Sequence, residues 1–323
     1  MQLRDPKNRN LWRLVVLVVA VVMGPLIFPA SAAAEKAARA GADAVLEGLQ
    51  SPEPAERADA ARQLSGVAIE LWTRDFDTVA PAFLAALGDT DPDVRRSAAV
   101  SLFQATWVIW GSVEVPTEKE AVLAEASPKL RALHPQLLAH LGDSDPGVRE
   151  YLLRALGTWM PQIPSGLSLE VLERVDDPSA KVANLALRVI GRAGERTAEV
   201  EAKVLEALEE KAELRATAAA VLGELYAEPT KSTGRAPASA EIVEALARAA
   251  GDVEEPVRLA ALRALGKIGA GSEAARARLQ AAADDTRESE RVRQVAEESL
   301  HLLDAYEATA SGAGSAPPEG EGS

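Results

Sequence analysis

The stretch LGDTDPDVRRSAAVSL, Leu87–Leu102, decides the fold, because LGDSDPGVREYLLRAL, Leu141–Leu156, repeats its layout. Each copy places an aspartate and a proline before an apolar pattern, and a third such pair follows: Asp91-Pro92, Asp145-Pro146 and Asp177-Pro178. An aspartate before a proline is typical of a helix start. The carboxylate accepts unpaired backbone N–H groups, and a proline at the first helical position lacks only an N–H that would have no partner. We therefore expect a helix to begin at each pair.

An apolar stripe with a spacing of four residues follows each turn, as expected for one face of an α-helix. Seven copies align in phase: Glu56, Ala60, Leu64; Val94, Ala98, Leu102; Val148, Leu152, Leu156; Val182, Ala186, Ile190; Leu214, Ala218, Leu222; Val257, Ala261, Leu265; and Val292, Ala296, Leu300. A first apolar helix precedes each stripe. We expect Gly88, Gly142 and Gly251 to end such first helices in a left-handed conformation.

One helix pair cannot bury its own stripe, whereas stacked pairs can. The pattern therefore predicts an all-α fold, an α-solenoid of about seven helix-turn-helix repeats. The residues D-P-x-V-R-x-x-A-A-x-x-L of Asp91–Leu102 and EEPVRLAALRALGKIG of Glu254–Gly269 resemble HEAT repeats, in the short form also found in phycobilin lyases (PBS-lyase-type). The resemblance covers residues 36–304. It implies a solenoid that binds other macromolecules, and it implies no reaction.

The repeat phase is interrupted twice, which predicts insertions near residues 107–129 and 227–239. Residues 305–323 are rich in small residues, and we expect them to form a disordered tail.

The N-terminus has a basic start and then an uncharged run, LVVLVVAVVMGPLIFPASAAA, Leu14–Ala34. This pattern predicts a signal peptide over residues 1–32, with a small-residue cleavage site at Ala30-Ser31-Ala32. The alternative is an uncleaved anchor to about residue 34, because a run of about 20 uncharged residues can span a bilayer. Either way the rest of the chain is exported, to the periplasm or extracellular space or facing outward from the inner membrane. A chain without cysteine suits a bacterial cell envelope.

The net charge is −14 at pH 7, although the first residues are basic. An acidic body repels phosphate backbones, so we expect no nucleic-acid partner. Neutral or basic protein partners are favoured. Contact with a membrane is expected only through the N-terminal segment, if it is not cleaved.

No catalytic or metal-binding pattern emerges. His134 and His140 are six residues apart and would lie on different sides of a helix. The triplet Asp89, Asp91 and Asp93 lacks the glycine and glutamate that complete a calcium-binding loop. No nucleophile and base converge, so we expect no enzyme activity, metal or cofactor.

Aromatic residues are unevenly placed, and the tryptophans after residue 12 all belong to the first three copies: Trp72, Trp107, Trp110 and Trp159. One interpretation is that they fill gaps between the longer first repeats. The other is an exposed aromatic ridge, extended by Tyr151, that binds a partner.

Arginines recur directly after the first stripe residue: Arg95, Arg149, Arg258 and Arg293. We expect them to pair with an aspartate of a neighbouring turn rather than with a ligand.

The sequence therefore predicts a non-catalytic protein-protein interaction scaffold exported to the bacterial cell envelope. Two alternatives remain open. One is a HEAT-like lyase, chromophore-handling or other enzyme-accessory protein. The other is a self-assembling structural component of the envelope.

Overall fold

The computed structural model describes residues 41–74, 76–111, 133–159, 169–227, 238–268 and 272–310, and every regular element within these ranges is a helix. The chain divides into two compact units, Met1–His140 and Leu141–Ser323. The predicted all-α fold is confirmed. Among the described residues, no helix combines the length and the apolarity needed to cross a bilayer. The predicted export segment lies outside the described residues.

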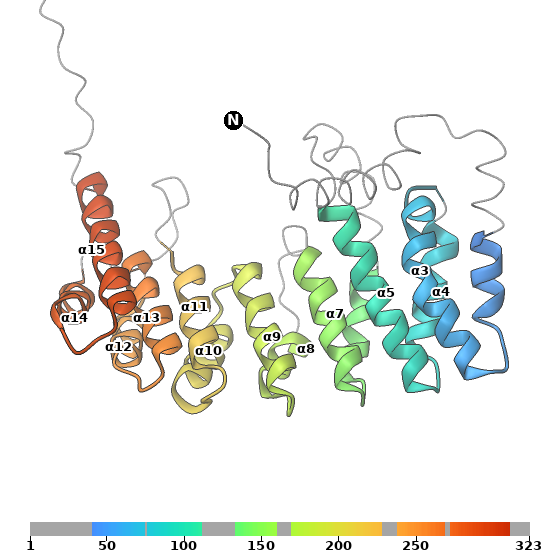
Figure 1. Ribbon diagram of the computed structural model, residues 1–323, viewed down its shortest axis with the longest axis horizontal. Coiled ribbons are helices and arrows are strands. Elements are labelled where there is room, and N and C mark those ends of the chain that lie inside the picture. Colours follow the sequence, from blue (N-terminus) through green and yellow to red (C-terminus); the bar gives the residue numbers. More distant parts are fainter. Residues whose placement is uncertain are drawn as a thin grey trace, which may run out of the picture. The chain divides into compact units, whose positions relative to one another are not determined.

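The first unit contains helical residues 41–48, α3 (Pro54–Arg74), α4 (Phe76–Leu87), α5 (Pro92–Gly111) and helical residues 133–139. The second helices of two consecutive repeats, α3 and α5, pack side by side, and α4 packs against both (Figure 1). The side chains of Leu64, Phe83 and Leu102 are fully buried between them.

The second unit begins with the short helix η1 (His140–Gly142), which spans the boundary. The second helices of its repeats are α7 (Pro146–Trp159), α9 (Ala180–Ala193), α11 (Arg215–Leu225), α13 (Glu255–Ile268) and α15 (Glu290–Ala310). The first helices are α8 (Leu169–Glu173), continued by η3 (Arg174–Asp176), α10 (Ala198–Glu210), α12 (Ala240–Ala249) and α14 (Glu273–Asp284).

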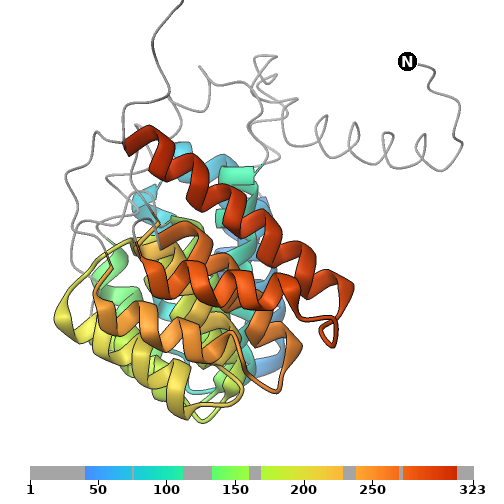
Figure 2. The same ribbon diagram turned by 90° about the vertical axis from the view of Figure 1, so that its left-hand side faces the viewer.

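Each second helix of this unit packs against the next second helix, and α10, α12 and α14 pack in the same order (Figure 1). Figure 2 shows α15 as the long dark-red helix at the end of this row. The apolar stripe lies between the two layers. Val182, Ala186 and Ile190, for example, are at most 1 % exposed. Stacking therefore buries what one helix pair would leave in water.

Two predicted helix starts are capped by their aspartates. The carboxylate of Asp91 accepts the N–H groups of Asp93 and Val94, and Asp145 does the same for Gly147 and Val148.

The third predicted start is wrong, because α9 begins at Ala180 and its N-cap residue is Ser179. The carboxylate of Asp177 instead accepts the N–H of Ser179 and forms an ion pair with Arg149. The turn therefore continues for two more residues before α9 begins.

The predicted left-handed glycines are also wrong. Among the described residues only Gly194, which ends α9, has a positive φ, of 69°. The N–H of Gly88 donates to the carbonyls of Leu84 and Ala85. The last turn of α4 therefore tightens, and Gly88 does not adopt a positive φ. Gly251 has a different role. A Cβ there would lie 2.8 Å from an Nη atom of Arg278, whose guanidinium donates to the carbonyl of Ala250.

Two predicted boundaries move. Helix α5 continues through residues 107–111, so these residues extend a repeat helix. The end of the second insertion does not move, because Ser239 is the N-cap of α12. Helix α15 continues to Ala310 instead of ending at residue 304, because Arg276 on α14 pairs with Asp304 and Glu307. Residues 112–129 and 228–237 of the predicted insertions, and residues 311–323, lie outside the described residues.

Candidate functional site

A groove in the first unit lies on the surface between the N-terminal halves of the second helices α3 and α5. It has a volume of about 770 Å³ and is floored by small or apolar side chains, including Ala55, Ala58 and Val100. Its rim carries four carboxylates and two arginines: Glu53, Asp59, Asp91, Asp93, Arg62 and Arg96. Both arginines pair with a carboxylate on their own helix, Arg62 with Asp59 and Arg96 with Asp93. The groove therefore combines an apolar floor with an acidic rim.

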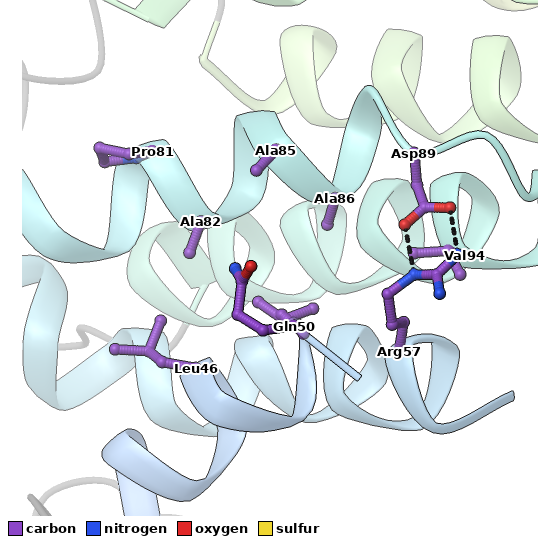
Figure 3. Close-up of a pocket in the computed structure, with 10 residues that line it drawn as sticks. Leu46, Gln50, Arg57, Pro81, Ala82, Ala85, Ala86, Asp89 and Val94 are labelled. Carbon is purple, nitrogen blue, oxygen red and sulfur yellow. Dashed lines mark hydrogen bonds and ion pairs between the residues drawn. The ribbon is translucent and has the colours of Figure 1, made fainter. Parts of the chain in front are cut away.

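A second groove in this unit lies between helical residues 41–48 and α4, with a volume of about 550 Å³. Figure 3 shows Leu46 and Gln50 on one side and Pro81, Ala82 and Ala85 on the other, with the Arg57–Asp89 pair at one end. Most of its lining is apolar.

The Arg57–Asp89 pair closes that end by two parallel hydrogen bonds, of 2.7 and 2.9 Å. The guanidinium of Arg57 holds the pKa of Asp89 below its usual value, and the same hydrogen bond raises the pKa of Arg57. A third nitrogen of Arg57 donates to the carbonyls of Ser51 and Pro52. All three nitrogens of the Arg57 guanidinium therefore donate hydrogen bonds, either to the turn before α3 or to the turn before α5.

Arg149 repeats this arrangement in the second unit. Its guanidinium forms two 2.7 Å hydrogen bonds with Asp177 in the turn before α9, and it also donates to the carbonyls of Asp143 and Ser144. Burial alone would raise the pKa of Asp177, but hydrogen bonds from Arg149 and from the Ser179 backbone outweigh it and lower that pKa. Hydrogen bonds to Asp177 raise the pKa of Arg149.

The other in-phase arginines also contact turns. Arg95 donates to the carbonyls of Asp89 and Thr90, and Arg293 donates to the carbonyl of Glu288.

Arg258, the remaining one of the four predicted arginines, pairs with a glutamate instead of an aspartate, and Arg215 adds a further pair to the series. Arg215 pairs with Asp252 at 2.8 Å, and Arg258 pairs with Glu288 at 3.1 Å. These side chains hold consecutive repeats together.

The candidate aromatic ridge can be placed only by its backbone. Trp72 lies in α3, Trp107 and Trp110 lie in α5, and Trp159 ends α7; the side chains of all four lie outside the described part of the structure. Tyr151 on α7 is half-buried, and the guanidinium carbon of Arg154 lies 6.0 Å from its ring centroid. Trp159 and Tyr151 belong to the second unit and the other three to the first.

The three histidines occupy separate elements: His134 in helical residues 133–139, His140 in η1 and His301 on α15. Within the described ranges, no group of three or more histidine, aspartate or glutamate side chains is arranged to hold a metal ion.

From α7 to α13, charge is divided between the two helix layers of the second unit, whereas α14 and α15 do not follow this division. The second helices α7, α9, α11 and α13 carry nine arginines and lysines against three glutamates. The first helices α8, α10 and α12 carry nine glutamates against Lys203 and Arg248. The net charge of the chain conceals this division.

Four cations of this unit were not predicted as functional residues: Arg188 and Arg192 on α9, and Arg263 and Lys267 on α13. Their signal was the repeat phase, because each pair stands six and ten residues after the first stripe residue of its copy.

Residues 204–301 match the HEAT repeats family. The predicted resemblance is thus confirmed for the segment from α10 to α15. No curated protein matches the sequence.

The solved structures that this chain resembles include the following three. The designed armadillo repeat protein YIII(Dq)4CqI is 18% identical, over 80% of this chain and 98% of that one, with a TM-score of 0.40. Kap121p is 14% identical, over 82% of this chain and 33% of its own, with a TM-score of 0.42. An engineered protein is 16% identical, over 81% of this chain and 95% of its own, with a TM-score of 0.42.

Proposed function

We propose that this helical repeat protein is a non-catalytic protein-protein interaction scaffold, exported to the bacterial cell envelope. Stacked repeats present an extended surface whose side chains are free to vary, which suits the binding of another protein. The observation that carries the proposal is the groove between α3 and α5, whose apolar floor is open along two consecutive second helices.

The acidic rim of this groove favours a neutral or basic partner. Both rim arginines are held by carboxylates of their own helices, so the unbalanced charge on the rim is negative. A basic side chain of a partner would therefore gain from entering it, while its apolar part would cover Ala55 and Val100.

The proposed compartment rests on the N-terminal sequence. The basic start and the uncharged run Leu14–Ala34 support export, either by cleavage after Ala32 or by retention as an anchor. N-terminal sequencing of the mature protein from a cell-envelope fraction tests this directly. A chain that begins near residue 33 supports cleavage, and an intact Met1 in the cytosolic fraction would contradict export.

The scaffold proposal is tested by capturing partners from the envelope fraction with the full chain, followed by quantitative mass spectrometry. Ala55→Arg places a long cation in the groove and is expected to release a neutral or basic partner. Ala202→Arg, the same change at an exposed position of α10, is expected to retain it. A Trp72→Ala, Trp110→Ala variant, shown to be folded by circular dichroism, tests the aromatic ridge in parallel.

A partner that wild type and Ala202→Arg capture and Ala55→Arg loses would support the scaffold and locate its binding groove. Equal capture by all variants would remove the groove from the interface. Failure of wild type to capture any partner would contradict the proposal and favour the self-assembling alternative.

A further inference from the structure

Four cations on the second helices of the second unit have no carboxylate partner among the described residues: Arg188, Arg192, Arg263 and Lys267. Neighbouring cations of the same layer are paired, since Lys181 and Arg154 both lie 2.9 Å from Glu150. Arg192 makes one hydrogen bond, to the carbonyl of Gly157. Three of the four side chains are exposed and Lys267 is partly exposed. The protein therefore leaves this set of charges free for another molecule.

The four cations lie in one register. Arg188 and Arg192 are four residues apart on α9, and Arg263 and Lys267 are four apart on α13, so each pair lies on one side of its helix. Between α9 and α13 lies α11 (Figure 1), which places Ala220 and Glu224 at the corresponding positions. We call these six residues the outer row.

Close packing keeps the three helices of the outer row in phase. A Cβ on Gly191 would lie 3.2 Å from Val221 on α11. A Cβ on Gly223 would lie 2.9 Å from Ala264 on α13. Neighbouring packed helices are about 8–10 Å apart, so the two cation pairs are separated by roughly 16–20 Å. An extended polypeptide covers that distance with about five or six residues.

We propose that the outer row binds an extended acidic segment of a partner protein, crossing α9, α11 and α13. The inference rests on the proposed scaffold function and adds the chemistry of a second partner surface. Two groups of aspartates or glutamates, about five or six residues apart, would each meet one cation pair. The exposed Ala220 leaves room for the backbone of the segment to approach α11 between them.

A polypeptide fits this surface better than a nucleic acid does. The outer row holds only four cations beside Glu224, and the chain as a whole carries a net charge of −14. A phosphate backbone has a charge at every nucleotide and would be repelled by most of the molecule. A short segment with two acidic groups meets the cations and avoids the glutamates of the first helices.

Removal of Glu224 tests the proposal, because its expected effect on binding is opposite to that of removing the cations. Glu224 forms no ion pair within the described part of the chain, and its Oε2 atom leans toward α9, 2.8 Å from where a Cβ of Gly191 would lie. This carboxylate would repel an acidic segment. Its removal is therefore expected to strengthen binding, whereas removal of the cations weakens it.

The experiment measures fluorescence anisotropy of a labelled synthetic peptide with two glutamate pairs about six residues apart, mixed with the full chain at low ionic strength. Matched peptides replace every glutamate with glutamine or with lysine, and a single-stranded DNA oligonucleotide provides the nucleic-acid arm. The variant Arg188→Gln, Arg263→Gln removes two exposed cations without structural contacts. Arg248→Gln removes one cation from α12 and serves as the control for each single substitution, Arg188→Gln or Arg263→Gln.

We expect binding of the glutamate peptide alone, weakened about two- to five-fold for each cation removed and weakened by added salt. Glu224→Gln is expected to tighten binding, and Arg248→Gln to leave it unchanged. Preference for the lysine peptide or for DNA would overturn the proposal. If the peptide does not bind but envelope partners are still captured by the Arg188→Gln, Arg263→Gln variant, the acidic segment is wrong and the scaffold function stands.

Discussion

Arg149 and Asp177 illustrate how one residue pair joins two repeats. Their side chains are 8 % and 0 % exposed, less than any other ion pair between described residues. Asp177 also accepts the N–H of Ser179, so its carboxylate shapes the turn that precedes α9. A buried charge without its partner is strongly unfavourable. Removing either residue of this pair should therefore destabilise the folded protein.

Asp177→Asn is therefore expected to destabilise the folded protein by about 3 kcal/mol at neutral pH, because Arg149 stays buried without a counter-charge. The folded-state pKa of Asp177 is lowered. The pair thus contributes fully above the unfolded pKa of about 3.9 and loses its contribution as pH falls through the folded value. Urea unfolding at a series of pH values should show the gap between wild type and variant shrinking below about pH 4.

The matched control is Glu209→Gln, which breaks the exposed pair of Glu209 with Arg248. An exposed pair contributes less than about 1 kcal/mol, so this variant should unfold close to wild type. A loss as large as that of Asp177→Asn would show that burial does not govern these pairs.

At the scale of the helix, glycines set how closely the second helices of the second unit approach. They stand nine residues after the first stripe residue in four consecutive copies: Gly157, Gly191, Gly223 and Gly266. A Cβ on Gly266 would lie 2.6 Å from the Cβ of Ser299 on α15, and one on Gly223 would lie 2.9 Å from the Cα of Ala264 on α13. Backbone atoms cannot move aside as a flexible side chain can.

Gly223→Ala is expected to destabilise the protein by about 1–3 kcal/mol, because α11 and α13 must separate to admit the methyl group. Gly157→Ala is the matched control at the same repeat position. Its Cβ would lie 3.4 Å from the tip of Arg192 and 3.6 Å from a methyl group of Val189, and it would meet no backbone atom within 4 Å. Alanine favours a helix over glycine by about 0.5–1 kcal/mol. Thermal unfolding should place Gly223→Ala below wild type and Gly157→Ala at or above it. The reverse order would contradict the close-packing explanation.

The helices could be predicted from the sequence because their cause is local and periodic. The spacing of Val182, Ala186 and Ile190 depends on helix geometry alone, and all three are buried as expected. The start of α9 could not be predicted, because Asp177 is committed to Arg149, a residue from the preceding repeat.

The same limit applies to the glycines. Local rules predict a left-handed Gly251, whereas its surroundings are set by Arg278 on another helix. Local rules give Gly223 no role, although the backbone of α13 lies against it. Contacts between repeats therefore could not be predicted from the sequence pattern. The groove between α3 and α5 and the outer row are products of such contacts, which is why the sequence predicted a binding role and did not predict these positions.

At the scale of the molecule, the surface of α15 bears on self-assembly. It is the last second helix of the described chain, and the exposed side chains on it are mainly polar or charged, including Arg291, Gln294, Glu297, Glu298 and His301. A second copy stacked on this helix would bury Glu297 and Glu298. Removing each carboxylate from water costs several kcal/mol unless a partner compensates it. The helix thus resembles a terminal capping repeat, whose polar face keeps a repeat array soluble.

We therefore expect light scattering to give the mass of one chain, 34.0 kDa for the full sequence, at every protein concentration. The measurement should be repeated with the variant Glu297→Gln, Glu298→Gln, which lacks the charge that opposes stacking. A constant mass for wild type, with growth only for the variant, would show that these carboxylates keep the protein monomeric. A mass that rises with concentration at neutral pH would contradict the capping role of α15. It would move the self-assembling component ahead of the scaffold, because an array that stacks through its ends does not need a groove for a second protein.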